Sequence, residues 1–219
     1  MSSMDRHDVN EALLMDYAAG SLAEPVALAV ASHVSLNQAA RAAYADFNRV
    51  GGLMLDDLEP EEMDDDALDA VLDRLDEMAV SVPAPRLDAE TQELIPAPLQ
   101  PYLAASLADL PWRRIGLGVE EYRVPVPGDT HRVSLLRIKP GRAMPRHTHR
   151  GPEYTVVLDG SYTDGDRVLG RGDLDYEDVA DHHQPVADKD TGCLCLIVLD
   201  APVKLTGMVG RLINPFLRN

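Results

Sequence analysis

The sequence has few basic residues for its length. Its 219 residues include 20 lysines and arginines against 37 aspartates and glutamates, which gives a net charge of −17. Nonspecific binding to DNA, RNA or an anionic membrane needs a positive field, so this charge argues against direct binding to any of them. A basic protein partner is favoured instead.

Cysteine and long apolar runs are also scarce. The two cysteines, Cys193 and Cys195, stand one residue apart, a spacing that suits no disulfide within one strand and makes no disulfide framework. The apolar run Val26–Ala31 is too short to cross a membrane or to act as the core of a signal peptide. These absences predict a cytoplasmic protein.

The charge is unevenly distributed along a chain that is otherwise globular in composition, with 45% hydrophobic residues. Residues 1–80 hold 18 acidic residues and four arginines, a net charge of −14, whereas residues 81–219 hold 19 acidic and 16 basic residues. This asymmetry predicts two domains with different roles.

Apolar residues recur at helical spacing through residues 1–80. The pattern and its capping residues predict four helices: Asp8 to about Ala19, one that begins near Pro25, Asn37 to Asn48 ending near Gly51 and Gly52, and one containing Leu68–Met78. The last helix carries an apolar stripe on an otherwise acidic surface. We therefore expect an acidic helical domain over residues 1–80.

Proline and short β-like runs characterise the remainder. Five prolines in residues 81–101 predict a linker, with one short helix around Asp88–Leu94. From Trp112 onward, short apolar runs alternate with Gly, Pro and Asp, which is typical of an antiparallel sandwich or barrel over residues 102–219.

Histidine and glutamate are spaced for metal binding in this second part. His147 and His149 would share one face of a strand, Glu153 follows after a turn, and a further histidine stands about thirty residues on. These groups form a mixed nitrogen and oxygen ligand set that suits Zn, Fe, Mn, Ni or Cu. His182 and His183 compete as the last ligand, and alternation along a strand allows only one of them.

The stretch resembles the cupin superfamily. It matches the motif G-x5-H-x-H-x3-E-x6-G at Gly141, His147, His149, Glu153 and Gly160. A second, looser motif is matched by Gly172, Asp173 and His183, although its customary Pro-x-Gly is replaced by residues 175–178. The resemblance implies a double-stranded β-helix, or jelly-roll barrel, with one divalent metal held by His147, His149, Glu153 and His183. The expected fold is therefore α + β, with a helical bundle followed by this barrel.

The whole arrangement resembles the ChrR family of anti-sigma factors over nearly its full length. The shared features are acidic helices with His7 and His33, a proline-rich linker and a single cupin with a Cys-x-Cys pair. The resemblance implies that the helical domain binds zinc and an extracytoplasmic-function sigma factor. It also implies that the cupin binds zinc and is needed for the response to singlet oxygen and related stress.

The sequence departs from this family at the first zinc site. The family pattern there is an early histidine followed by H-x3-C-x2-C, which His7 and His33 match, but the two cysteine positions hold Asn37 and Ala40. Alanine cannot bind zinc and asparagine is a poor ligand. We therefore interpret His7 and His33 as partly buried helix residues, with a weak or lost metal site as the alternative.

Cys193 and Cys195 should face the same side of their strand. They are interpreted as small buried apolar residues. If that side is the barrel interior, the alternative is a redox-active pair.

The leading hypothesis is a regulator rather than an enzyme. The acidic helical domain would cover the basic DNA-binding surfaces of a sigma factor, the apolar stripe would dock into a groove, and a stress such as singlet oxygen would act on the cupin to release the partner. Zinc is the expected metal, with Fe, Mn and Ni as alternatives. The alternative function is a mononuclear metal enzyme, such as a dioxygenase or an isomerase, because three histidines and one glutamate leave coordination positions open.

Overall fold

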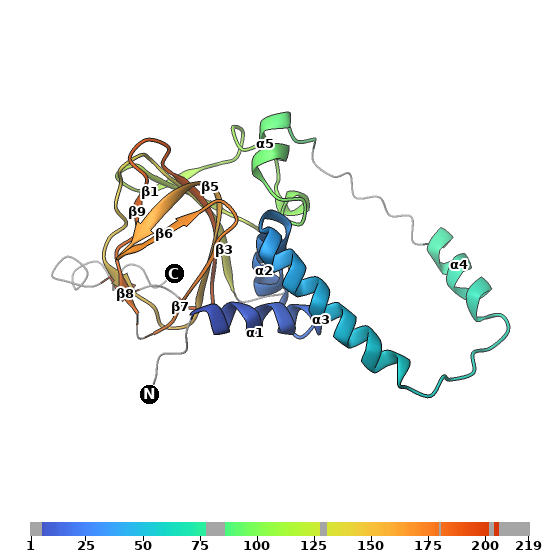
Figure 1. Ribbon diagram of the computed structural model, residues 1–219. Helices are drawn as coiled ribbons and strands as arrows, with labels where there is room; N and C mark the ends of the chain where they lie inside the picture. The colour runs from blue at the N-terminus through green and yellow to red at the C-terminus, as the bar shows by residue number, and fades with distance from the viewer. Residues whose placement is uncertain (1–5, 78–85, 128–130, 180, 202–203, 206–219) are drawn as a thin grey trace.

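The structure is a computed structural model, and it describes residues 6–77, 86–127, 131–179, 181–201 and 204–205. Helices occupy the first part of the chain and antiparallel strands the second, which confirms the expected α + β order (Figure 1). None of the described helices is long and apolar enough to cross a bilayer.

All four predicted helices are present: α1 (Arg6–Ala18), α2 (Glu24–Leu36), α3 (Gln38–Asp56) and α4 (Ala67–Glu77). The predicted end of α3 near Gly51 and Gly52 is wrong, because the helix continues to Asp56. Glycine costs about 1 kcal/mol in a helix but does not by itself end one. At the other end of α3, the side chain of Asn37 accepts a hydrogen bond from the backbone N–H of Ala40 at 3.1 Å and caps the helix.

Only three of these helices form a packed bundle. α1, α2 and α3 contact one another, and α1 and α2 also contact strands of the barrel, whereas α4 stands apart from them (Figure 1). The apolar side chains of α4 are correspondingly open to solvent, with 49–66% of Leu68, Val71, Leu72 and Leu75 exposed. The expectation of a four-helix domain is therefore corrected to three packed helices and one separate helix.

The proline-rich segment is partly folded. The predicted short helix is confirmed as α5 (Ala89–Leu94), capped by Asp88, and a 3-10 turn, η1 (Gln100–Tyr102), follows it. Ile95 and Leu99 are fully buried. The domain boundaries at residues 80 and 101 remain a prediction, but the end of the predicted linker packs into the protein.

Eleven strands of the described residues form two antiparallel sheets. The larger has the order β1-β2-β3-β10-β5-β6, with β7 and β9 also paired to β5, and the smaller has the order β11-β4-β8. The strands are β1 (Arg113–Gly116), β2 (Val119–Arg123), β3 (Arg132–Ile138), β4 (His147–Thr148), β5 (Glu153–Asp164), β6 (Arg167–Gly170), β7 (Leu174–Glu177), β8 (His182–His183), β9 (Val186–Ala187), β10 (Cys193–Leu199) and β11 (Lys204–Leu205). Together they make the expected barrel.

Alternation along β10 separates two hydrophobic cores. Cys193 and Cys195 belong to a cluster inside the barrel, whereas Leu194, Leu196 and Val198 belong to a cluster that continues into the helices. The second cluster includes the fully buried Ala29 and Val30 of α2 together with Val156 and Leu158 of β5. The helices therefore cover the outer face of the sheet and share one core with it.

Gly160 lies where the chain leaves no room for a side chain. Its φ is +68°, and a Cβ there would overlap the backbone carbonyl of Gly192. We expect Gly160→Ala to lower the free energy of unfolding by about 3 kcal/mol, from left-handed backbone strain plus overpacking. Urea unfolding measures this loss.

Gly165→Ala is the matched control for that substitution. Gly165 also has a positive φ, +58°, but a Cβ there meets open space. Gly165→Ala should therefore lower the free energy of unfolding by only about 1 kcal/mol, from backbone strain alone. Equal losses in the two variants would contradict the steric argument for Gly160.

Candidate metal centre

Three short elements bring the predicted metal ligands together. β4 carries His147, and His149 follows directly after it. β4 pairs antiparallel with β8 so that His147 lies opposite His183, and Glu153 begins β5. All four side chains are buried. The sheet register, rather than closeness in sequence, places His183 beside the other two histidines.

The imidazole nitrogens converge on one point. Nε2 of His183 lies 2.9 Å from Nε2 of His147 and 3.0 Å from Nε2 of His149. Donor atoms of the three histidines and Glu153 all lie within 4.8 Å of one another. His182 is exposed and outside this group, as alternation along β8 requires.

The charge state of these groups suits a cation. Burial, together with the neighbouring imidazoles, lowers the pKa of His147 and of His149 to about 4, so both are neutral near pH 7. Burial raises the pKa of the Glu153 carboxyl to about 7. Among the described residues, the ion-pair partner of this carboxyl is His149, which is neutral near pH 7, and a divalent cation would supply the positive charge.

The outward-facing nitrogens support the same conclusion. Nδ1 of His147 lies 2.8 Å from the carbonyl oxygen of Pro145, and an N–H there leaves the lone pair of Nε2 aimed at the centre. Nδ1 of His149 lies 3.4 Å from a carboxylate oxygen of Glu153, and Nδ1 of His183 lies 3.5 Å from one of Asp164, and neither nitrogen makes a well-formed hydrogen bond. The four residues therefore fit a metal ion, which would tie β4, β5 and β8 together and could act as a Lewis acid.

Acidification should destabilise the metal-free protein. The unfolded chain protonates histidine near pH 6.5, whereas folded His147 and His149 stay neutral until about pH 4, so the unfolded state binds more protons in this window. The raised pKa of Glu153 has the opposite effect on stability, because the folded state then binds the extra proton. This single group is outweighed by the two histidines. We expect the urea midpoint of chelator-treated protein to fall from pH 7 to pH 5.

The size of that fall is checked with two variants. His147→Gln removes one of the buried titrating groups and should show a smaller fall, while His182→Ala, on the exposed face of β8, should match the parent chain. A midpoint that rises on acidification would contradict the assignment of neutral buried imidazoles.

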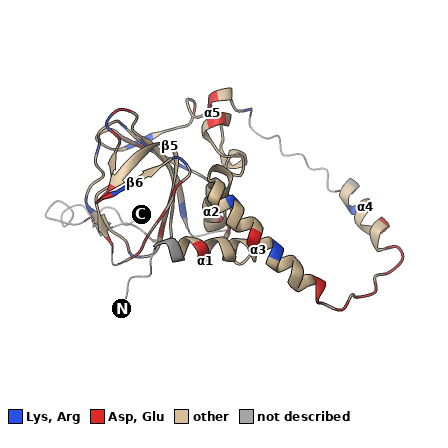
Figure 2. Cartoon of the chain, in the orientation of Figure 1, with Lys and Arg blue, Asp and Glu red and all other residues tan. Residues whose placement is uncertain are grey.

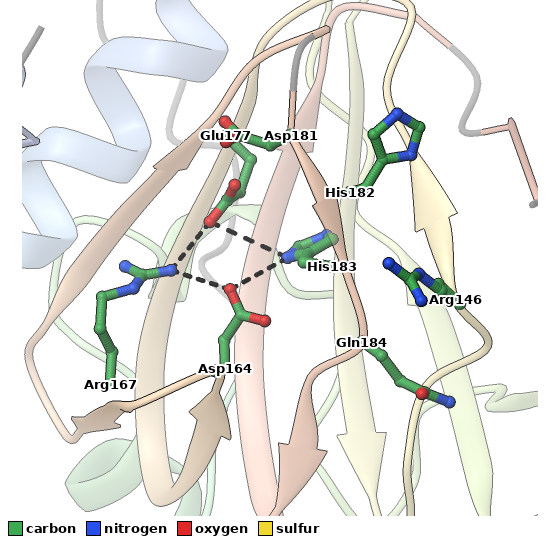
Figure 3. A pocket seen from close by; sticks show the side chains of 9 residues that line it. Arg146, Asp164, Arg167, Glu177, Asp181, His182, His183 and Gln184 are labelled. Atoms are coloured by element: carbon green, nitrogen blue, oxygen red, sulfur yellow. Dashed lines mark hydrogen bonds and ion pairs between the residues drawn. The ribbon is translucent and has the colours of Figure 1, made fainter. Parts of the chain in front are cut away.

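A hollow of about 380 Å³ lies beside the centre. Its lining includes the following residues, shown in Figure 3: Arg146, Asp164, Gly165, Arg167, Glu177, Asp181, His182, His183 and Gln184. Sequence reasoning missed Asp164, Arg167 and Glu177, and it treated residues 175–178 only as a departure from the cupin motif. The available signal was the spacing of Asp175 and Glu177, which places both carboxylates on one face of a strand close to Arg167.

The predicted histidines of the helical part do not form a described metal group. His7 lies in α1, but its side chain is outside the described residues. His33 is buried on α2, and its Nδ1 donates a hydrogen bond to the carbonyl of Gly172 in the barrel at 2.6 Å. Burial lowers the pKa of His33. Its partner is thus a backbone carbonyl, while Asn37 serves as a helix cap.

The two thiols face the barrel interior together. Cys193 and Cys195 are buried free thiols, and their sulfur atoms lie 3.1 Å apart in a hydrogen bond. The hydrogen bond with Cys193 and burial raise the pKa of the Cys195 thiol, which disfavours a reactive thiolate. A redox role for the pair remains a prediction.

Comparison with protein families and known proteins gives consistent matches. The family model described as "ChrR Cupin-like domain" matches residues 101–202. The chain is 38% identical over 213 residues to the protein named anti-sigma-E factor ChrR of Cereibacter sphaeroides, and the match covers 97% of this chain and 98% of that protein.

A solved structure is similar over most of the chain. It is the crystal structure of Rhodobacter sphaeroides SigE in complex with the anti-sigma ChrR, with 36% identity and a TM-score of 0.72. The match covers 87% of this chain and 96% of that one.

Proposed function

The chain belongs to the ChrR family of anti-sigma factors, and we propose that it sequesters an extracytoplasmic-function sigma factor in the cytoplasm and releases it when its metal centre responds to a stress. Its relative of known structure is described in complex with a sigma factor, SigE. Family membership favours this role over that of a mononuclear metal enzyme.

The observation that carries the proposal is the exposed apolar surface of α4 and the adjoining end of α3. The exposed apolar side chains from the end of α3, through the connecting segment, to α4 are Leu53, Met54, Leu55, Leu58, Met63, Leu68, Val71, Leu72 and Leu75. A group of large apolar side chains that is open to solvent marks a site of protein interaction, because leaving them in water is unfavourable. A helix that stands apart with its apolar stripe open can dock into a groove of a partner.

Charge suits a basic partner at the same place. Seven of the ten residues between α3 and α4, residues 57–66, are acidic, and Figure 2 shows them on the segment that leads to the separate helix. This field attracts the arginines and lysines with which a transcription factor contacts DNA phosphates, and it competes with DNA for them. The apolar stripe would then provide most of the affinity for the partner, and the acidic residues would increase the rate at which the two proteins meet.

The cupin is the proposed sensory part. The buried ligand set of His147, His149, Glu153 and His183 is proposed to hold zinc, since three imidazoles and one carboxylate in a compact site suit that ion. Singlet oxygen is the proposed signal, on the strength of the family resemblance alone. No step of the proposal requires turnover of a substrate.

Direct binding tests the proposal. Full-length zinc-loaded chain is titrated against each extracytoplasmic-function sigma factor of the source organism, labelled for fluorescence anisotropy. We expect one of them to bind with a Kd well below 1 µM, as about 1,600 Å² of a well-packed interface allows. Absence of binding to every such factor would exclude the proposal.

A further inference from the structure

A buried network of charges lies directly behind His183. The guanidinium of Arg167 donates to Asp164 and Glu177 at 2.9 Å each (Figure 3) and to Asp175 at 2.6 Å. All three carboxylates are almost completely shielded from water. Because the three anions share the guanidinium of Arg167, this side chain helps to determine where the carboxylates lie.

His183 connects this network to the metal centre. Its Nε2 faces His147 and His149, whereas its Nδ1 faces Asp164 at 3.5 Å and Glu177 at 3.8 Å. Histidines that bind metals usually donate their second N–H to a carboxylate, which fixes the ring and strengthens it as a ligand. The buried Nδ1 of His183 has no other hydrogen-bond partner.

The carboxylates are not a second metal site. Asp164, Glu177 and His183 lie close enough together to hold a cation, but the guanidinium of Arg167 already supplies the positive charge at this position. Pairing with the carboxylates also raises the pKa of Arg167, which keeps it charged. The network therefore serves the neighbouring centre rather than an ion of its own.

The same strand reaches the helices at its other end. Asp175 and Glu177 lie in β7, and Asp175 also accepts a hydrogen bond from Tyr162. Just before them, the carbonyl of Gly172 accepts from His33 of α2, and the carbonyl of Leu174 accepts from Asn10 of α1 at 3.3 Å. One short segment, Gly170–Glu177, thus contacts Arg167 and His183 on one side and two helices on the other.

The contact at Gly172 is too close to be incidental. Its φ is +91°, and a Cβ added there would lie 3.1 Å from the backbone oxygen of Leu36 at the end of α2. Close packing of this kind transmits displacement, because dense protein interiors do not absorb it in voids.

We propose that Arg167 is a positioning residue for the metal centre, and that the Gly170–Glu177 segment it holds couples metal occupancy to the docking of α1 and α2 on the barrel. This inference rests on the metal-binding part of the proposed function. A bound metal ion would fix His183, and His183 and Arg167 would fix β7. The Gly170–Glu177 segment presents the carbonyls of Gly172 and Leu174, which His33 and Asn10 bind. Because coupling between two sites is reciprocal, a substitution that loosens the network should also weaken binding of the metal ion.

The first test measures zinc affinity of the full chain by competition with a chromophoric chelator. Arg167→Gln removes the cation, and Asp164→Asn removes one acceptor while keeping its shape, which preserves the test if the first variant does not fold. We expect each to weaken zinc binding by about 10- to 100-fold. Arg167→Lys, which keeps the charge without the fork of donors, should give an intermediate loss.

The matched control is Arg137→Gln. Arg137 is also a partly buried arginine of the barrel, but it packs on the ring of Trp112 at 4.1 Å and lies outside the network. Its zinc affinity should equal that of the parent chain. Unchanged zinc affinity in both Arg167→Gln and Asp164→Asn would overturn the positioning role.

The second test measures hydrogen exchange of the α1 and α2 amides with and without saturating zinc. We expect saturating zinc to slow hydrogen exchange of these amides in the parent chain and in Arg137→Gln. In Asp164→Asn, saturating zinc should leave their exchange unchanged. If zinc binds the parent chain but leaves helix exchange unchanged, the coupling is wrong while the proposed function stands. If the parent chain binds no zinc, the metal part of the proposed function fails, and this inference fails with it.

Discussion

The double substitution Leu72→Asp and Leu75→Asp should weaken binding of the sigma factor by at least about 100-fold. The two side chains are 49% and 60% exposed on α4, and α4 stands apart from the packed helices, so the fold should be retained. Burying a leucine in an interface is worth about 1.5–3 kcal/mol, and two of them account for about 3–6 kcal/mol, where 1.4 kcal/mol is tenfold in affinity. Aspartate in an apolar groove adds a desolvation penalty.

The control for this loss is another exposed leucine. Leu117, between β1 and β2, is 86% exposed and lies on the barrel, far from α4 in the sequence. Leu117→Asp adds a like charge without touching the proposed docking surface, so fluorescence anisotropy should give the affinity of the parent chain. Wild-type affinity in the α4 double variant would exclude α4 as the docking element.

The second large effect is expected at the metal centre. His149→Ala should abolish copurification of zinc and the rise in thermal midpoint that zinc gives the parent chain. A ligand that binds only the folded state stabilises it by about 4 kcal/mol at a concentration a thousand times its Kd. Metal content by emission spectroscopy and the thermal midpoint with and without zinc measure both effects.

His182→Ala is the matched control for His149→Ala. His182 is adjacent to the proposed ligand His183, but it lies on the exposed face of β8, so this substitution removes an imidazole from outside the centre. It should retain zinc and the zinc-dependent rise in midpoint. Loss of zinc in His182→Ala but not in His149→Ala would refute the ligand assignment, and bound iron with oxygen-dependent turnover would favour the enzyme alternative.

Local patterns predicted much of this structure because their causes are local. The helices follow from apolar spacing and capping residues, and the barrel from short alternating runs. The spacing of His147, His149 and Glu153 follows from strand alternation and one turn, so the centre was visible in the sequence. Strand alternation showed that only one of His182 and His183 can be a ligand, and the resemblance to the second cupin motif favoured His183, which the register places opposite His147.

Features that depend on packing between distant segments could not be predicted. The hydrogen bond from His33 to Gly172 joins residues 139 apart, and no motif in either segment specifies it. The Arg167 network likewise requires the register of β5, β6 and β7. The position of α4 was missed because its amphipathic pattern is the same whether its apolar face covers its own domain or a partner.

Transcription reconstituted from purified components tests the central claim most directly. RNA polymerase, the sigma factor that binds this chain and a promoter for that factor are incubated with zinc-loaded full-length chain. We expect transcript yield to fall to background at about one equivalent of chain over sigma factor, and to be unaffected by the α4 double variant. Undiminished transcription at a several-fold excess of a chain that binds zinc and is folded would contradict the account.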